Sequence, residues 1–251
     1  MMASVLVLLA LLPQLVDRTK DPIQLAPPSR ELSHEKRADI FMARKMYREG
    51  VETYQLALGQ RESPYLYNKL GIAYHHLLMF PNATRSYQKA VRLDKEYSQA
   101  INNLGTIYYA QKRYKRAIRQ YKRALTENPN SPSIHSNLGT AYFARKKYKG
   151  ATREYLQALL LDPLVFERRN SVGTLLQERS VRDKAQYNYF MARTYASAEL
   201  YDKSLLYLRR AFEEGYKKRK KIAEDPVFAP LLENPEFQQL VLSGQTTAQL
   251  R

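Results

Sequence analysis

One segment in the middle of the chain is present twice. Ser98 to Pro129 recurs as Pro132 to Pro163, an offset of 34 residues. The copies share residue types at matching places, which are Asn-Leu-Gly at 103–105 and 137–139, Tyr108 and Tyr142, Tyr114 and Tyr148, Ala117 and Ala151, Tyr121 and Tyr155, Ala124 and Ala158, and Pro129 and Pro163. A period of this length indicates that each copy is one supersecondary unit. Such a unit cannot bury its apolar surface alone and must stack on its neighbours.

Each copy is predicted to contain two amphipathic helices. In the first half of the unit, Leu104 and Tyr108 follow helical spacing, and in the second half Ala117 and Tyr121 do the same. Gly105 and Ala117 are small, so the two helices can approach closely there. Tyr108 and Tyr121 are large and can fill the space opposite them.

The period and these residue types resemble the tetratricopeptide repeat (TPR) family, in particular its bacterial-type members. The resemblance implies an all-α fold, a right-handed superhelical solenoid of about five TPR helix-turn-helix hairpins with a C-terminal capping segment. Five segments are predicted as repeats, which are a degenerate first repeat at 31–63 followed by repeats at 64–97, 98–131, 132–165 and 185–218.

The period is interrupted once and then ends. Residues 166–184 are predicted to form an inserted loop, and such a loop can be functional or mere variation. Residues 219–251 are predicted to be a C-terminal cap and tail. Within them Asp225-Pro226 and Asn234-Pro235 each place a good N-cap before a proline, so two short helices are expected to start there.

The N-terminal residues 1–16 are predicted to be a signal peptide or an N-terminal membrane anchor. The apolar run in this segment has about 14 residues, fewer than the roughly 20 that a spanning helix needs. Residues 17–30 contain three prolines and are predicted to be a linker. The expected localisation is therefore export, periplasmic or tethered to the membrane by the N-terminus. The alternative is a cytoplasmic protein with a disordered N-terminus.

No residue pattern in the sequence predicts catalysis, a metal site or a cofactor. The four histidines are scattered, no glycine-rich phosphate loop occurs, and the chain has no cysteine. His75 and His76 are adjacent, but neighbouring side chains on a helix point about 100° apart, so they are expected to be groove or surface residues rather than metal ligands. We predict that the protein is not an enzyme.

Basic residues dominate the charge of the chain. The net charge is +17, and the pI is about 9.9. Seven of the twelve residues from Lys112 to Arg123 are Lys or Arg, at positions between the packing residues. A solvated helix face explains this stripe, as does binding to an anionic membrane surface or, less favoured, to nucleic acid. The candidate basic surface consists of Lys112, Arg116, Arg119 and Arg123.

The TPR resemblance implies a ligand groove lined by the first helix of each hairpin. The groove positions predicted to bind a peptide hold Asn68, Lys69, Asn102, Asn103, Tyr109, Asn137 and Phe143. Asparagine offers both a donor and an acceptor to an extended peptide backbone. Hydrogen bonding between helices is an equally good explanation for these asparagines. The set of Lys and Arg that the carboxylate-clamp TPRs need is missing from these positions.

The function predicted from these observations is a noncatalytic protein-protein interaction scaffold that binds an extended peptide or partner helix in the concave groove. The alternative is a binder of an anionic surface or nucleic acid through the outer Lys/Arg stripe. The partner is expected to be a protein or peptide, whose identity the TPR fold does not select.

Overall fold

The computed structural model describes residues 32–167 and 184–242, and the chain divides into two units, Met1–Leu32 and Ser33–Arg251. All statements below concern the described part of the second unit. The predictions for residues 1–16, for the linker at 17–30 and for most of the insertion at 166–184 lie outside the described residues. Among the described residues, no helix is both long and apolar enough to cross a membrane.

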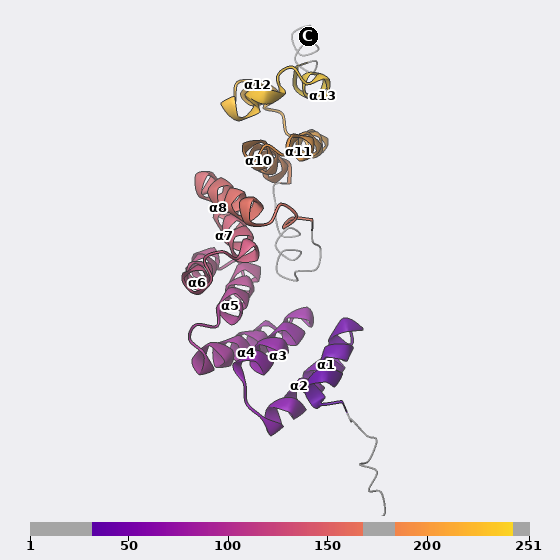
Figure 1. The fold of residues 1–251 in the computed structure, drawn as a ribbon, viewed down its shortest axis with the longest axis vertical. Helices are drawn as coiled ribbons and strands as arrows, with labels where there is room; N and C mark the ends of the chain where they lie inside the picture. Colours follow the sequence, from indigo (N-terminus) through magenta and orange to yellow (C-terminus); the bar gives the residue numbers. More distant parts are fainter. Residues whose placement is uncertain (1–31, 168–183, 243–251) are drawn as a thin grey trace, which may run out of the picture. The chain divides into compact units, whose positions relative to one another are not determined.

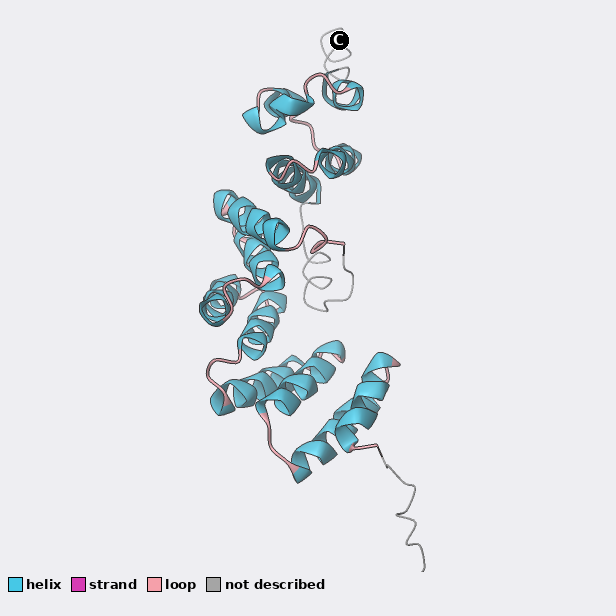
Figure 2. Cartoon of the chain, in the orientation of Figure 1, coloured by secondary structure: helices cyan, strands magenta, loops and turns pink. Residues whose placement is uncertain are grey.

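The described residues form helices and connecting loops, with no strand among them (Figures 1 and 2). Ten helices form five consecutive pairs, which are α1 His34–Ala43 with α2 Tyr47–Gln60, α3 Pro64–His76 with α4 Phe80–Leu93, α5 Ser98–Ala110 with α6 Tyr114–Glu127, α7 Pro132–Ala144 with α8 Tyr148–Leu161, and α10 Lys184–Ser197 with α11 Tyr201–Glu213. Each pair packs on the next as in a TPR solenoid, which confirms the predicted fold class.

Small residues on the first helices let the large tyrosines of the second helices pack against them. A β-carbon added to Gly105 would lie 2.7 Å from the Tyr121 ring, and one added to Gly139 would lie 2.6 Å from the Tyr155 ring. Both tyrosines are fully buried. This confirms the predicted small-to-large packing at Gly105 and Tyr121.

The hydroxyls of these tyrosines reach a fixed place on the preceding helix. Tyr121 donates to Thr106 Oγ1 at 3.3 Å, and Tyr155 donates to Thr140 Oγ1 at 3.0 Å, each across fifteen residues. In the second repeat the residue fifteen before Tyr87 is Ile72, and the described residues offer the buried Tyr87 hydroxyl no partner. Burial raises the pKa of Tyr87 accordingly.

A residue with positive φ follows the end of each first helix. Lys45, Leu78, Lys112, Lys146 and Glu199 have φ between 58° and 61°. The left-handed conformation turns the chain sharply, so the second helix can start a few residues later and run back along the first. The turns inside the hairpins therefore share one geometry in all five pairs.

The C-terminal segment covers the end of the fifth pair with α12 Arg219–Ala223, η1 Pro226–Leu231, α13 Pro235–Phe237 and η2 Gln238–Leu242. The Asp225 side chain accepts from Val227 N, and that of Asn234 accepts from Glu236 N and Phe237 N. Both predicted helix starts are thus confirmed. The first is a 3₁₀ helix with Pro230 inside it, and the preceding α12 was not predicted because its sequence, RKKIA, shows little apolar periodicity.

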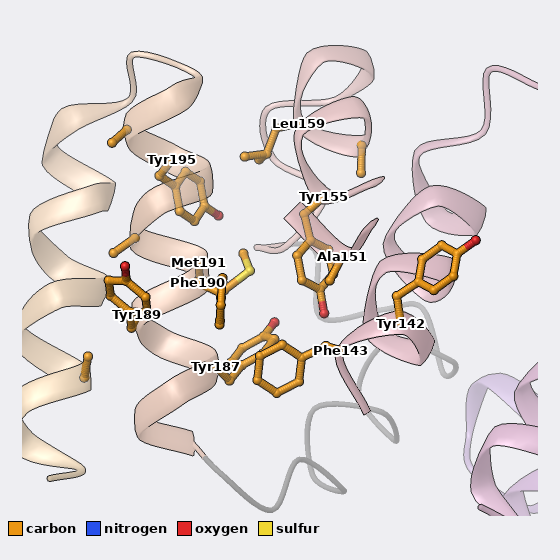
Figure 3. Packing of buried hydrophobic residues seen from close by; sticks show 14 of the residues in the cluster. Tyr142, Phe143, Ala151, Tyr155, Leu159, Tyr187, Tyr189, Phe190, Met191 and Tyr195 are labelled. Carbon is orange, nitrogen blue, oxygen red and sulfur yellow. The ribbon is translucent and has the colours of Figure 1, made fainter. Parts of the chain in front are cut away.

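Figure 3 shows the buried core where the fourth and fifth pairs meet, with Tyr155 and Phe143 facing residues of α10. Phe166, at the start of the predicted insertion, packs edge-on against Tyr155 and Tyr195, with ring centroids 5.5 Å and 6.3 Å apart. Lys184, its predicted last residue, is already the first residue of α10.

Candidate peptide-binding face

The predicted asparagines lie together on the first helices and form a chain of hydrogen bonds. Asn137 on α7 donates to Asn102 Oδ1 on α5 at 2.9 Å, and Asn102 donates to Asn103 Oδ1 at 3.3 Å. Asn103 in turn donates to Asn68 Oδ1 on α3 at 2.9 Å. The side chains of three successive repeats are therefore connected. We call these four residues the amide chain.

The amide chain extends to the loop before α5, where Asn68 donates to the Tyr97 hydroxyl at 3.4 Å. Asn68 and Asn137 are buried, whereas Asn102 and Asn103 are half-buried. Pairing between helices, one of the two explanations that the sequence left open, is thus present. These hydrogen bonds leave some donors and acceptors of Asn102 and Asn103 unused. A carboxamide has two N–H donors and two lone pairs, and each of these residues uses one of each in the chain.

Lys69 lies on the same helix face but is engaged with the first repeat. Its ammonium is 3.0 Å from Glu35 Oε1 and 2.7 Å from Asp39 Oδ2, and its side chain is 15% exposed. Burial alone would lower the pKa of Lys69, but hydrogen bonds to Asp39 and Glu35 raise it above the ordinary lysine value. The ammonium also lies 4.4 Å from the centre of the Tyr65 ring. Lys69 therefore connects α3 to α1.

Two predicted groove residues lie in the hydrophobic core instead. Tyr109 is buried against Tyr114, with ring centroids 5.1 Å apart. Phe143 is buried among Tyr148, Tyr187 and Phe190 at 5.4 to 5.8 Å (Figure 3). Each ring sits at the C-terminal end of a first helix, where the start of the second helix covers it. This corrects their placement in the groove.

His75 is also a core residue rather than a groove or surface residue. It packs edge-on against Phe80, with ring centroids 6.0 Å apart. Burial, together with the charge of His76, lowers the pKa of His75 to about 4. His76 stacks on Tyr47 of the preceding pair at 4.2 Å. Among the described residues, no three His, Cys, Asp or Glu side chains are grouped so that they could hold a metal ion.

Three more residues at the starts of the first helices are at least partly exposed. Tyr65, Gln99 and Ser133 occupy the second position of α3, α5 and α7; Tyr65 is 50% exposed, Gln99 is exposed and Ser133 is half-buried. Together with Asn102 and Asn103 they give this face polar groups and one aromatic ring that a partner can contact. We call these five residues the first-helix face.

The predicted basic residues Lys112, Arg116, Arg119 and Arg123 are all exposed on or just before α6. Arg116 lies 5.9 Å from the Tyr108 ring centre, and Arg123 donates to the Lys95 carbonyl at 2.7 Å. Lys112 and Arg116 also line a hollow of about 470 Å³ at the start of α6, with Arg113, Tyr114, Lys115 and Arg145. Five of its six lining residues are cationic.

Two polar clusters were not found from the sequence. His135 Nδ1 lies 2.8 Å from Glu154 Oε2, and its Nε2 lies 2.9 Å from the Pro129 carbonyl oxygen, which ties α7 to α8 and to the preceding loop. Arg193 Nε lies 2.7 Å from Asp225 Oδ2, which ties α10 to the C-terminal segment. These pairs are 19 and 32 residues apart, outside the spacing of a single helix, so no local pattern indicates them.

Comparison with known proteins agrees with this architecture. Residues 105–144 match the family model described as TPR repeat. A solved structure of pilF from Pseudomonas aeruginosa is 18% identical with a TM-score of 0.54, and the match covers 86% of this chain and 90% of that chain. A MamA structure from Desulfovibrio magneticus RS-1 is 15% identical with a TM-score of 0.50, and covers 72% of this chain and 92% of that chain. At these identities the likeness concerns the fold. No curated protein sequence is significantly similar to this chain.

Proposed function

The chain is a tetratricopeptide-repeat protein, and we propose that it is a noncatalytic scaffold that binds an extended peptide or a partner helix along the first-helix face. Stacked repeats of this kind are interaction scaffolds, because each hairpin adds one more binding position to a continuous surface. The partner is a protein or peptide.

The half-buried amides of Asn102 and Asn103 are the observation that supports this proposal most directly. The amide chain fixes both side chains in position, so little conformational entropy is lost when a ligand binds. Each amide retains one N–H and one lone pair. An extended peptide can use both, because its backbone offers a carbonyl and an N–H at every residue.

Site-specific photocrosslinking tests this face against the rest of the surface. A photoreactive amino acid placed at Gln99, which is exposed on α5, is expected to crosslink a protein partner in native membrane or soluble fractions. The matched control is Gln88, which is exposed on the second helix α4. A partner that crosslinks from Gln88 but not from Gln99 would show that the first-helix face is not the binding surface.

Isosteric substitution tests whether the amides take part in recognition. Asn103→Asp keeps the shape of the side chain but removes its N–H donors, whereas Gln88→Glu makes the same charge change on α4. We expect Asn103→Asp to weaken crosslinking from Gln99 and Gln88→Glu to leave it unchanged. If both variants crosslink as the parent does, the amides have no part in recognition.

The second candidate function is binding of an anionic partner through Lys112, Arg116, Arg119 and Arg123. The cationic hollow at the start of α6 favours it. Reversing the four residues to Glu is expected to weaken binding to anionic vesicles or RNA and to reduce its salt dependence. If the unmodified protein binds neither anionic vesicles nor RNA at moderate salt, these residues form an ordinary solvated surface.

A further inference from the structure

The hairpin turns carry a charge distribution that the rest of the solenoid lacks. The four turn segments 43–48, 77–82, 111–116 and 145–150 contain eleven cations and no Asp or Glu. The cations are Arg44, Lys45, Arg48, Lys112, Arg113, Lys115, Arg116, Arg145, Lys146, Lys147 and Lys149. The loops at the other ends of the same helices, 61–63, 94–97, 128–131 and 162–165, contain two cations and four carboxylates. Helices of 13 or 14 residues separate the two sets by about 20 Å.

Contacts between neighbouring repeats bring these turns together along one edge. Tyr47 at the start of α2 stacks on His76 at the end of α3, which places the first turn against the second. The hollow at the start of α6 is lined by the third turn and by Arg145 of the fourth. Helix α3 packs on α5, and α5 packs on α7, so the first helices that lead into the second, third and fourth turns are neighbours. We call the four turns the basic edge.

Within the described residues, the cations of the basic edge have no partner of opposite charge. None of the eleven forms an ion pair with a carboxylate of the described residues. Ten of them are exposed, and Arg145 is half-buried. The fifth turn differs, since Glu199 and Asp202 stand there. An unneutralised edge of this kind attracts an extended anionic partner.

The second turn adds exposed apolar side chains to the same edge. Leu78 is 62% exposed and Met79 is 42% exposed, and Met46 of the adjoining first turn is 37% exposed. Leu78 also has a φ of 58°, a conformation that favours glycine or asparagine. The corresponding residues of the other turns are all charged. Neither packing nor backbone conformation explains a leucine at this position.

A lipid bilayer can bind both the cations and the exposed apolar side chains of the basic edge, whereas nucleic acid can bind only the cations. Anionic headgroups attract the cations, and the acyl boundary takes up exposed Leu and Met side chains. Nucleic acid would leave Leu78 and Met79 in water. It would also find no free ring for base stacking among the turn tyrosines, because Tyr47 stacks on His76, Tyr114 packs on Tyr109 and Tyr148 stacks on Phe190.

We propose that the basic edge docks the solenoid onto an anionic lipid bilayer, with Leu78 and Met79 entering the interface between the flanking cationic turns. This proposal shares Lys112 and Arg116 with the second candidate function, but it places the binding surface on the turns rather than along α6 and names one partner class. It does not depend on peptide binding by the first-helix face, because that face lies in the N-terminal halves of the first helices and the turns follow their C-terminal ends.

The test compares binding of the full chain to phosphatidylcholine vesicles with and without phosphatidylserine. The ratio of the two partition coefficients is the measurement, because any insertion that depends only on apolar segments contributes to both. The edge variant Lys115→Glu, Lys147→Glu, Lys149→Glu places its new carboxylates at helix starts, where the helix dipole favours them, so folding is preserved. The control Arg85→Glu, Arg119→Glu, Lys122→Glu makes the same charge change on exposed helix faces of α4 and α6.

We expect the edge variant to lower the ratio at least ~10-fold, since each cation near an anionic surface strengthens binding several-fold, and the control to lower it much less. A ratio near one for the unmodified protein, or an equal loss in both variants, would overturn the proposal. A loss in the control alone would instead support the α6 stripe as the binding surface.

A double substitution in the second turn separates lipid from nucleic acid. Leu78→Asn with Met79→Ser suits the left-handed backbone and removes the apolar side chains without changing charge. We expect this variant to bind phosphatidylserine vesicles more weakly and to bind a single-stranded RNA as the unmodified protein does. Unchanged vesicle binding, or RNA binding that outcompetes the vesicles in the unmodified protein, would overturn the lipid assignment.

Discussion

The buried tyrosines of the second helices differ from one another in whether the hydroxyl has a partner. Tyr155 donates to Thr140, but Ile72 stands where Tyr87 would need an acceptor. Repeats with the same packing thus differ by one hydrogen bond. A buried polar group without a partner carries the cost of its desolvation, whereas a paired one contributes modestly to stability.

Removing these two hydroxyls should therefore have different effects on stability. We expect Tyr155→Phe to lower the free energy of unfolding by about 0.5 to 1.5 kcal/mol. Tyr87→Phe is expected to leave it unchanged or to raise it. Ile72→Thr should supply the missing acceptor for the Tyr87 hydroxyl and so raise the free energy of unfolding. Combined with Tyr87→Phe, it should give no such gain, because the hydroxyl that would donate is absent. Denaturant titration measures the unfolding free energy of all four variants, and equal losses for the two Tyr→Phe variants would contradict the assignment.

His75 gives the fold a dependence on acid pH. Its folded pKa is about 4, below the value near 6.5 of an unfolded chain, so between these values only the unfolded chain binds the proton. The free energy of unfolding should fall as the pH drops through this window, by at most about 3 kcal/mol from this residue. We expect His75→Phe to remove that contribution. The difference in unfolding free energy between parent and variant should change from pH 7 to pH 4; a constant difference would contradict the prediction.

Within a helix pair, the effect of replacing a glycine depends on what its missing side chain would contact. Gly105 faces Tyr121, but Gly59 in α2 has nothing within 4 Å of an added β-carbon. Both residues are helical. The two Gly→Ala changes therefore compare a mid-helix glycine packed against a tyrosine ring with a glycine in the last turn of a helix, where the added β-carbon meets nothing.

We expect Gly105→Ala to lower the free energy of unfolding by about 1 to 3 kcal/mol, because the Tyr121 ring must shift within a filled core. Gly59→Ala should raise it by about 0.5 to 1 kcal/mol, the usual helix preference for alanine. Thermal melting of the two variants checks this. Stabilisation by Gly105→Ala would mean that the ring has room to move.

At the scale of the whole molecule, stability and surface chemistry both follow from stacking. Each pair contacts its neighbours in sequence, so residues at equal places in successive repeats come to lie side by side. A bias that recurs in several units, such as Lys and Arg in the first, third and fourth turns, is thereby concentrated on one edge. The net charge of +17 is for this reason unevenly distributed.

The N-terminal segment concerns the localisation of the protein. We propose that residues 1–16 direct export or tether the chain to a membrane, which would bring the basic edge near lipid. A fusion of residues 1–30 to a reporter that is active only after translocation is expected to be active. Activity of a reporter that works only in the cytoplasm would contradict the proposal.

The period, the helix pairs and the packing within each pair could be predicted from the amino-acid sequence. Each of these depends on residues within one repeat, where helical spacing shows which side of a helix meets its own partner. The glycine opposite Tyr121 and the caps at Asp225 and Asn234 depend only on residues close to them in the sequence, and the structure contains them as predicted.

The contacts on the remaining sides of each helix could not be predicted from the sequence, because they depend on how the repeats stack. Asn103 meets Asn68, Lys69 meets Asp39, and Phe143 meets Phe190 because adjacent repeats cover the flanks and ends of the first helices. The spacing of residues along one helix gives the direction of a side chain but not what the neighbouring repeat places opposite it. Predicted groove residues could therefore be located on a helix from sequence, while their burial and their partners depended on how the repeats stack.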